Sequence, residues 1–253
     1  MTATESDPAR APRRADPAAI DAERFVATVS HDLESSLLVL TNNLELLRTE
    51  GPALSAEQQD LVERIERTTM RMKRLLSGVR HFTRANNPPE STRVPLHEVL
   101  AECLELLAPT IDERAADVAV TGPMPTIVGD HDQLVQLFQN LLSNAIKFGP
   151  QGGRVTVSAS RGHRAWRISV SDRGPGIALD NHDRVFEPFR RLRETGHVPG
   201  TGLGLTICMR VATNHGGSLT IEPTGPRGAT FVFTLPDHRP ASLSQSSSSV
   251  EPI

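Results

Sequence analysis

Asn140-Leu-Leu-Ser-Asn144 is the first of three stretches that together decide the fold of this chain. It lies in residues 130–148, where apolar residues recur at the spacing of one helix face. The two asparagines stand one helical turn apart, so both amides project to the same side, and Lys147 follows close to that face. Two amides and an ammonium suit hydrated Mg²⁺ with a triphosphate, because Mg²⁺ prefers hard oxygen ligands. A polar helix face without a ligand has the same pattern.

The other two stretches are rich in glycine. Asp172-Arg-Gly174-Pro-Gly176 follows a strand pattern, and its carboxylate can accept a hydrogen bond from an exocyclic amine while the glycines admit a base. Gly200-Thr201-Gly202-Leu203-Gly204 opens a helical pattern, whose amides and dipole can hold phosphate oxygens. Each stretch alone also fits an ordinary turn or helix start. In this order and at these separations, the three predict a nucleotide pocket.

A helical hairpin is predicted upstream of the pocket. The first helix, about residues 21–48, has an apolar stripe of Phe25, Val29, Leu33, Leu37, Leu40, Leu44 and Leu47. Gly51-Pro52 ends it, and Ser55 followed by Gln58 reads as a capping box that opens the second helix. The second helix has a heptad-like repeat of Leu61, Ile65, Thr68, Met72, Leu75, Val79 and Phe82.

The apolar stripes of this hairpin are too wide for one partner helix to cover. A homodimer that forms a four-helix bundle would cover them. The alternative is that the hairpin packs against the rest of its own chain. We favour the dimer and keep the alternative open.

The residues after the hairpin alternate between helical and strand patterns. Helices are expected at about 96–114, 130–148 and 203–214, and strands at about 117–120, 154–158, 166–171, 218–222 and 230–235. The fold class is therefore multidomain α and α+β, in which the helical hairpin is followed by an α/β sandwich that has one mixed sheet covered on one face by helices. The expected division is a disordered tail at 1–19, the hairpin domain at 20–88, the domain with the predicted nucleotide pocket at 92–236 and a disordered tail at 237–253.

Composition narrows the class of protein only a little. The chain has 253 residues, enough for one or two domains, and a formal net charge of −3, which gives no electrostatic reason to expect nucleic acid. No apolar run approaches the roughly 20 residues of a membrane span, and the N-terminus does not resemble a secretory signal. Cys103 and Cys208 each stand alone in an amphipathic helical pattern, which favours small buried hydrophobes over a disulfide or metal pair. We therefore expect a cytoplasmic protein without membrane insertion.

His31 is the candidate phosphate acceptor. On a helical wheel it falls opposite the centre of the apolar stripe of the first helix, where a core histidine would not lie. An ordinary surface histidine has the same position. Asp32 adjoins it and can accept the imidazole Nδ1 proton, which leaves the Nε2 lone pair for attack on phosphorus.

The sequence around His31, Phe25-Val-Ala-Thr-Val-Ser-His-Asp-Leu-Glu-Ser-Ser-Leu37, resembles the phosphoacceptor box of sensor histidine kinases. In that family the histidine is the acceptor and its acidic neighbour is the base. Ser36 stands where the family usually has a helix-bending proline. Ser35 stands where members that also dephosphorylate their partner usually have Thr or Asn, so phosphatase activity is not expected.

The three nucleotide stretches resemble the boxes of the superfamily that contains histidine kinases, gyrase, Hsp90 and MutL. Residues 185–189, Val-Phe-Glu-Pro-Phe, resemble the phenylalanine box of the histidine kinases, which adds Phe189 to the ATP site. The resemblance implies that Asn144, with Asn140, holds Mg²⁺, that Lys147 contacts phosphate and that Asp172 reads the adenine amine. It also implies a lid at about 190–201.

One position separates kinase from ATPase in this superfamily. Its hydrolysing members have a glutamate base where this chain has Asn140, and an amide is a poor base for activating water. The expected function is therefore an ATP-dependent protein-histidine kinase of a two-component system, with ATP and Mg²⁺ as cofactors. Its expected partners are a second copy of the chain, a response-regulator receiver domain and a separate sensor or input protein.

Three other classes remain open on the sequence alone, and the simplest is a structural, non-enzymatic dimer. The second is a phosphotransfer scaffold with a degenerate nucleotide domain, which ATP binding would exclude. The third is a plain ATPase or a serine/threonine kinase of the same superfamily, which acid-labile, base-stable labelling would exclude.

Overall fold

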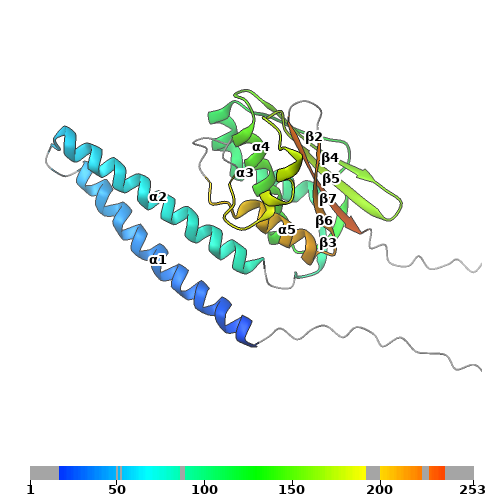
Figure 1. Cartoon of the computed structure of the whole chain (residues 1–253), viewed down its shortest axis with the longest axis horizontal. Coiled ribbons are helices and arrows are strands. Elements are labelled where there is room, and N and C mark those ends of the chain that lie inside the picture. Colours follow the sequence, from blue (N-terminus) through cyan, green and yellow to red (C-terminus); the bar gives the residue numbers. More distant parts are fainter. Residues whose placement is uncertain are drawn as a thin grey trace, which may run out of the picture. The chain divides into compact units, whose positions relative to one another are not determined.

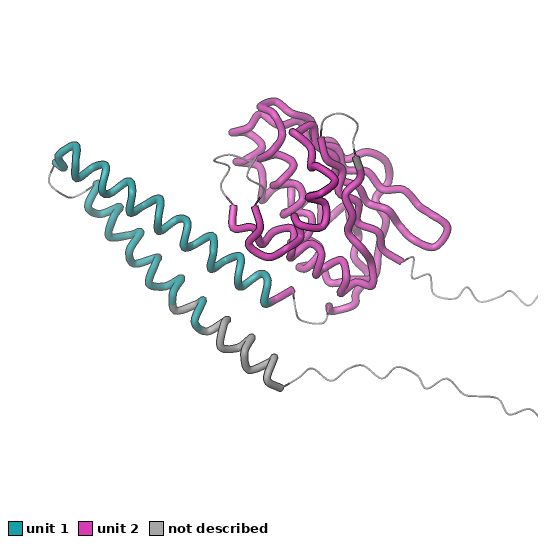
Figure 2. Tube along the Cα trace, in the orientation of Figure 1, with its two compact units in different colours: residues 1–83 teal, residues 84–253 magenta. Residues whose placement is uncertain are grey.

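The computed structural model describes residues 17–49, 51, 53–85, 89–191, 200–223 and 228–236, without the side chains of residues 17–28, 31, 32 and 223. The chain divides into two compact units, residues 1–83 and 84–253 (Figures 1 and 2). The predictions for the lid and for most of both tails fall outside the described residues. None of the described helices is both long enough and apolar enough to span a bilayer.

The first unit is a hairpin of two long helices, α1 (Pro17–Thr49) and α2 (Ala56–Arg84), whose last residue already belongs to the second unit. Ion pairs Arg48–Glu66 and Arg80–Glu34 fix the helices antiparallel. The predicted capping box is confirmed, because Gln58 N donates to Ser55 Oγ and Ser55 N to Gln58 Oε1, at 3.3 and 2.9 Å.

The start of α1 corrects one prediction. Residues 17–19, expected in a disordered tail, are helical. Proline is favoured at the first helical position, where its fixed φ suits the helix and its missing N–H costs nothing. Pro17 therefore begins the helix, and the two alanines that follow are strong helix formers.

The second unit has a five-stranded sheet in the order β2-β4-β5-β7-β6. Its strands are β2 (Asp117–Thr121), β4 (Arg154–Arg161), β5 (Ala165–Ser171), β6 (Ser218–Pro223) and β7 (Ala229–Pro236). Only β2 and β4 pair in parallel. This is the predicted mixed sheet.

Three helices cover one face of this sheet (Figure 1). They are α3 (Leu96–Arg114), α4 (His131–Phe148) and α5 (Gly204–Asn214). The apolar side of α4 is buried as predicted, and Phe138 on α4 meets Phe233 on β7 edge to face, with ring centroids 6.2 Å apart. Cys103 and Cys208 are both buried and free, as expected.

Four short elements were not predicted from the sequence. β1 (Thr92–Pro95) and β3 (Thr126–Gly129) pair antiparallel in a separate two-stranded sheet. Two 3₁₀ helices, η1 (Leu179–Asn181) and η2 (Arg184–Phe186), follow the Asp172 turn. Segments of three or four residues are too short for a periodic pattern to stand out.

Candidate functional site

Helix α4 carries the polar groups at the centre of the site. Asp130 caps its N-terminus, since Asp130 Oδ1 accepts a hydrogen bond from Gln133 N at 3.0 Å. Asn140 and Asn144 are half-buried on the side away from the core, and Lys147 is exposed in the last turn. Asn140 Nδ2 is buried and has no hydrogen-bond partner among the described residues. A buried amide donor without a partner is costly, so this atom points to a ligand.

Asp172 lies at the end of β5 and is 7% exposed. Its Oδ1 accepts hydrogen bonds from Gly174 N at 2.7 Å and from Ala229 N at 3.2 Å. Oδ2 receives no hydrogen bond from the described residues, so it remains able to accept one from an amine. Burial raises the pKa of Asp172 above its ordinary 3.8, and the two backbone N–H donors lower it in part.

The Asp172 turn packs closely on the end of α4. A methyl group on Gly174 would lie 2.8 Å from the carbonyl oxygen of Phe148, the last residue of α4. Gly176 has φ +81°, a conformation that residues with a side chain rarely adopt. The turn can therefore approach the helix only because these positions are glycine.

The glycine turn before α5 packs against the phenylalanine box. Gly202 has φ +76°, and a methyl group there would lie 2.7 Å from the carbonyl carbon of Phe189. Phe189 itself has φ 60° and is 62% exposed. A residue with a side chain at positive φ has a strained backbone, and Phe189 is such a residue.

A side chain that the sequence did not single out joins these two segments. Thr206 Oγ1 donates to the carbonyl oxygen of Phe186 at 2.8 Å, so α5 is tied to η2. Leu203 is buried at the start of α5, and Thr201 Oγ1 accepts from Leu203 N at 3.3 Å. Helix α5 begins at Gly204, one residue later than predicted.

The C-terminal half of α4 is where the three predicted stretches meet. A methyl group on Gly204 would lie 3.2 Å from Asn140 Oδ1, while Gly174 borders Phe148. A methyl group on Gly200 would have no neighbouring atom within 4 Å among the described residues, so the backbone there faces open space. These residues offer an amine acceptor, amide ligands and exposed backbone N–H groups, which is the set that an adenine nucleotide needs.

The phosphoacceptor residues belong to the hairpin. His31 and Asp32 lie within α1, but their side chains are outside the described ones. Ser35 and Ser36 are exposed on the same helix.

Comparison with known proteins places both units in one family. Residues 21–88 match the model of the His Kinase A (phospho-acceptor) domain, and residues 129–239 match that of the histidine kinase-, DNA gyrase B- and HSP90-like ATPase. The chain is 34% identical over 227 residues to the sensor-like histidine kinase SenX3 of Mycolicibacterium smegmatis, covering 85% of this chain and 57% of SenX3. It is 31% identical over 219 residues to the phytochrome-like protein Cph1 of Synechocystis sp., covering 85% of this chain and 29% of Cph1.

Solved structures agree with this placement. Full-length ShkA in complex with AMPPNP matches with a TM-score of 0.66 and 32% identity, over 85% of this chain and 46% of ShkA. A structure of the mycobacterial sensor histidine kinase MprB matches with a TM-score of 0.52 and 32% identity, over 58% of this chain and 97% of that one. The chain belongs to the histidine kinase family and contains its phosphoacceptor hairpin and its ATP-binding domain. It spans less than two thirds of the length of the curated relatives named above.

Proposed function

We propose that this chain is an ATP-dependent protein-histidine kinase that phosphorylates itself on His31. The observation that carries the proposal is that the Asp172 turn and the glycine turn both lie along the C-terminal half of α4, beside Phe148 and Asn140, in a chain whose hairpin matches a phosphoacceptor domain. We take the hairpin domain as residues 20–88 and the catalytic domain as residues 92–236.

Each residue of the pocket has a part in holding ATP. Asp172 Oδ2 accepts a hydrogen bond from the adenine amine, because Oδ1 is already held by two backbone donors. The backbone from Gly200 to Gly204 holds phosphate oxygens, with Lys147 close to the phosphates. Phe189 lines the pocket at the exposed end of its box.

The donor set of α4 fits Mg²⁺. Asn144 and Asn140 supply neutral side-chain carbonyl oxygens, and Mg²⁺ prefers such hard ligands together with water and phosphate. Bound there, the ion would neutralise charge on the phosphates during transfer. The unpartnered Nδ2 of Asn140 is a donor, so it suits a phosphate oxygen of the nucleotide and not the cation itself.

The chemistry follows from what the pocket lacks among its described side chains. Asn140 cannot act as a base, so the pocket does not activate water for attack on the γ-phosphate. Asp32 holds the Nδ1 proton of His31, and Nε2 attacks the γ-phosphorus. The new N–P bond forms as the bond from phosphorus to the β,γ-bridging oxygen breaks, and ADP leaves.

A second copy of the chain is the proposed partner of the hairpin. Val29, Leu33, Leu40 and Leu47 are exposed on α1 beside the buried Leu37 and Leu44. A hollow of about 530 Å³ between the helices is lined by Thr41, Leu44, Glu45, Arg48, Thr49, Glu66, Thr69 and Met70. Exposed leucines in a stripe support a dimeric four-helix bundle, which would bury them.

Membership of the histidine kinase family supports the proposal of two further partners. We propose that the phosphoryl group passes from His31 to an aspartate on a response-regulator receiver domain, and that a separate sensor or input protein controls the kinase. We propose that the reaction takes place in the cytoplasm, where ATP is supplied. The two free buried thiols agree with a reducing compartment.

The test is autophosphorylation of the purified chain with Mg²⁺ and γ-labelled ATP. We expect label that is labile in acid and stable in base, lost in His31→Ala and reduced at least about a hundredfold in Asn144→Ala, because both groups act in the transition state. His163→Ala, which removes an exposed histidine, is the matched control and should label normally. Label that persists in His31→Ala would contradict the proposal.

A further inference from the structure

Helices α4 and α5 lie antiparallel, and three contacts mark their register. Gly204, the first residue of α5, borders Asn140 Oδ1. One turn on, Cys208 Sγ donates to Leu137 O at 3.5 Å. After the C-terminus of α5, His215 Nε2 accepts from Asp130 N at 3.0 Å. Each step forward along α5 is matched by a step backward along α4.

The apolar contacts between the two helices specify this register less sharply than a directional bond does. Ile207 and Val211 on α5 and Leu134 and Leu141 on α4 are buried, but hydrophobic burial has no preferred direction. Packed helices can shift by one or two ångströms along each other. The thiol of Cys208 is a weak donor, so the bond of His215 is the strong directional contact of the three.

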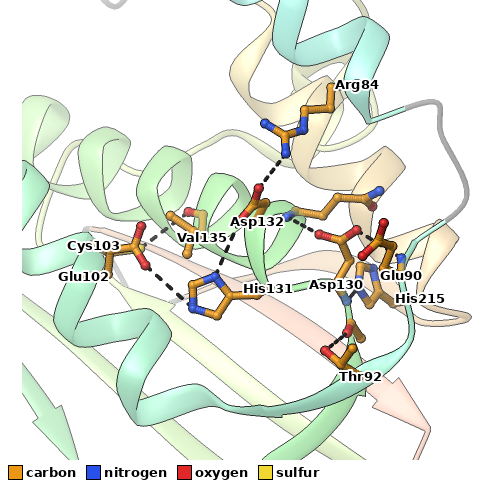
Figure 3. Close-up of polar contacts among 12 residues, drawn as sticks. Arg84, Glu90, Thr92, Glu102, Cys103, Asp130, His131, Asp132, Val135 and His215 are labelled. Carbon is orange, nitrogen blue, oxygen red and sulfur yellow. Dashed lines mark hydrogen bonds and ion pairs between the residues drawn. The ribbon is translucent and has the colours of Figure 1, made fainter.

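The surroundings of His215 hold its ring in one state (Figure 3). Because Asp130 N–H is the donor, Nε2 must be unprotonated, and Nδ1–H therefore donates to Val211 O at 2.8 Å. The ring is 7% exposed, and a methyl group on Gly129 would lie 2.6 Å from its Cδ2. A protonated ring would point an N–H at the Asp130 N–H and lose this bond.

Asp130, whose backbone N–H bonds to His215, is held by further hydrogen bonds of its own. Besides its backbone N–H, Asp130 uses Oδ1 to cap α4 and Oδ2 to accept from Glu90 N at 3.0 Å. A shift of His215 would therefore act on the N-terminus of α4 and not on a free loop.

We infer that His215 is a positioning residue of the nucleotide site: its neutral ring fixes the register of α5 along α4 and so sets Gly204 against Asn140. This rests on the proposed function, since it assigns the two ends of the contact to the phosphate and Mg²⁺ side of the pocket. A slip of one residue moves an α-helix about 1.5 Å along its axis and turns it by about 100°. Such a slip would turn the glycine turn away from Asn140.

The experiment measures Mg·ADP affinity of the intact chain by calorimetry, so that binding is observed without phosphorylation. His215→Phe keeps the ring volume and removes both hydrogen bonds, and should weaken affinity about tenfold or more. His215→Gln places an amide oxygen where Nε2 stood, and should stay within about threefold of the parent. Leu235→Ala, a buried change on β7, is the control for lost stability alone and should bind normally.

A second measurement uses only the parent chain, so it does not depend on whether a variant folds. In ¹⁵N NMR spectra of the parent chain at about pH 7.5, well above the ordinary histidine pKa, we expect the His215 ring to carry its proton on Nδ1. A ring protonated on Nε2 overturns the inference. So does a His215→Phe chain that binds Mg·ADP as the parent does.

The outcomes separate the inference from the proposed function. A parent chain that binds Mg·ADP but does not phosphorylate itself on His31 contradicts the kinase proposal. The variant series still decides the role of His215. A parent chain that binds no nucleotide overturns both. Autophosphorylation of His215→Phe should show a raised KM for ATP, whereas a loss in kcat alone contradicts a role in nucleotide positioning.

Discussion

Asp172 binds its own turn with one carboxylate oxygen, and the proposed function assigns the other to the nucleotide. Under the proposed function, the second oxygen gives the buried acid a use at a position where burial raises its pKa. A carboxylate with a raised pKa contributes its stability below the ordinary 3.8 and loses it as pH rises through the folded-state pKa. At neutral pH the charge of Asp172 therefore costs the folded state stability.

Asp172→Asn tests this assignment. The amide oxygen can still accept from Gly174 and Ala229, but an NH₂ group then faces the adenine amine. We expect the free energy of unfolding at about pH 7 to be unchanged or higher, and Mg·ADP binding to weaken by about 1–3 kcal/mol. Urea unfolding and calorimetry measure the two quantities. Asp180→Asn, at an exposed position, should change neither.

His215 gives a pH dependence of the opposite kind. Burial lowers its pKa below the ordinary 6.5, while the bond to Val211 and the charge of Asp130 raise it in part. The unfolded chain therefore takes up a proton first, and stability is full above pH 6.5 and declines as pH falls toward the lower folded-state pKa. Urea unfolding between about pH 8 and 5 should show this decline, and His215→Gln should flatten it. An equal slope in the two chains would contradict the assignment.

At the scale of the elements, the hydroxyl of Thr206 joins α5 to η2. Thr206→Val keeps the shape and leaves the Phe186 carbonyl without its donor, which should lower the free energy of unfolding by about 1 kcal/mol. Thr206→Ser keeps the hydroxyl and should retain most of the stability. Urea unfolding decides between them, and equal losses in both variants would mean that the bond contributes little.

The sequence pattern predicted the long helices and strands but missed the side-chain hydrogen bonds that join them. Residues 96–114 and 130–148 have enough turns for a helical stripe to stand out, so both helices were found within a residue or so of their ends. Thr206 and His215 were missed because each makes its tertiary contact through a single hydrogen bond, and no local pattern marks such a partner. The stretch from Asn214 to Gly217 reads only as the end of a helix.

The candidate site divides in the same way. Asn140, Asp172 and the glycine turn were predicted from their residue types and order, and the structure places them along the C-terminal half of α4. Ala229, which donates to Asp172 Oδ1, lies 57 residues further along the chain and has no side-chain chemistry to signal its role. A backbone donor of this kind becomes visible only in the fold.

At the scale of the whole molecule, the proposed dimer would form through the exposed leucines of the hairpin. Leu40 lies about 60° around α1 from the buried Leu37, whereas Leu46 lies about 180° from it. Both are exposed, at 39% and 49%. Leu40→Glu should raise the dimer dissociation constant by about tenfold to a hundredfold, because burial of a leucine contributes about 1.5–3 kcal/mol.

Sedimentation velocity measures the effect, and Leu46→Glu on the opposite face of the same helix is the matched control. We expect the control to remain a dimer at concentrations that dissociate Leu40→Glu. A parent chain that sediments as a monomer at every concentration would contradict the dimer proposal.

Contacts at both ends of α5 tie the length of the segment from Gly204 to His215 to the length of the facing segment from Asn140 to Asp130. A single inserted or deleted residue in either span cannot be absorbed at one end without breaking the match at the other. These two helices can therefore change length only together.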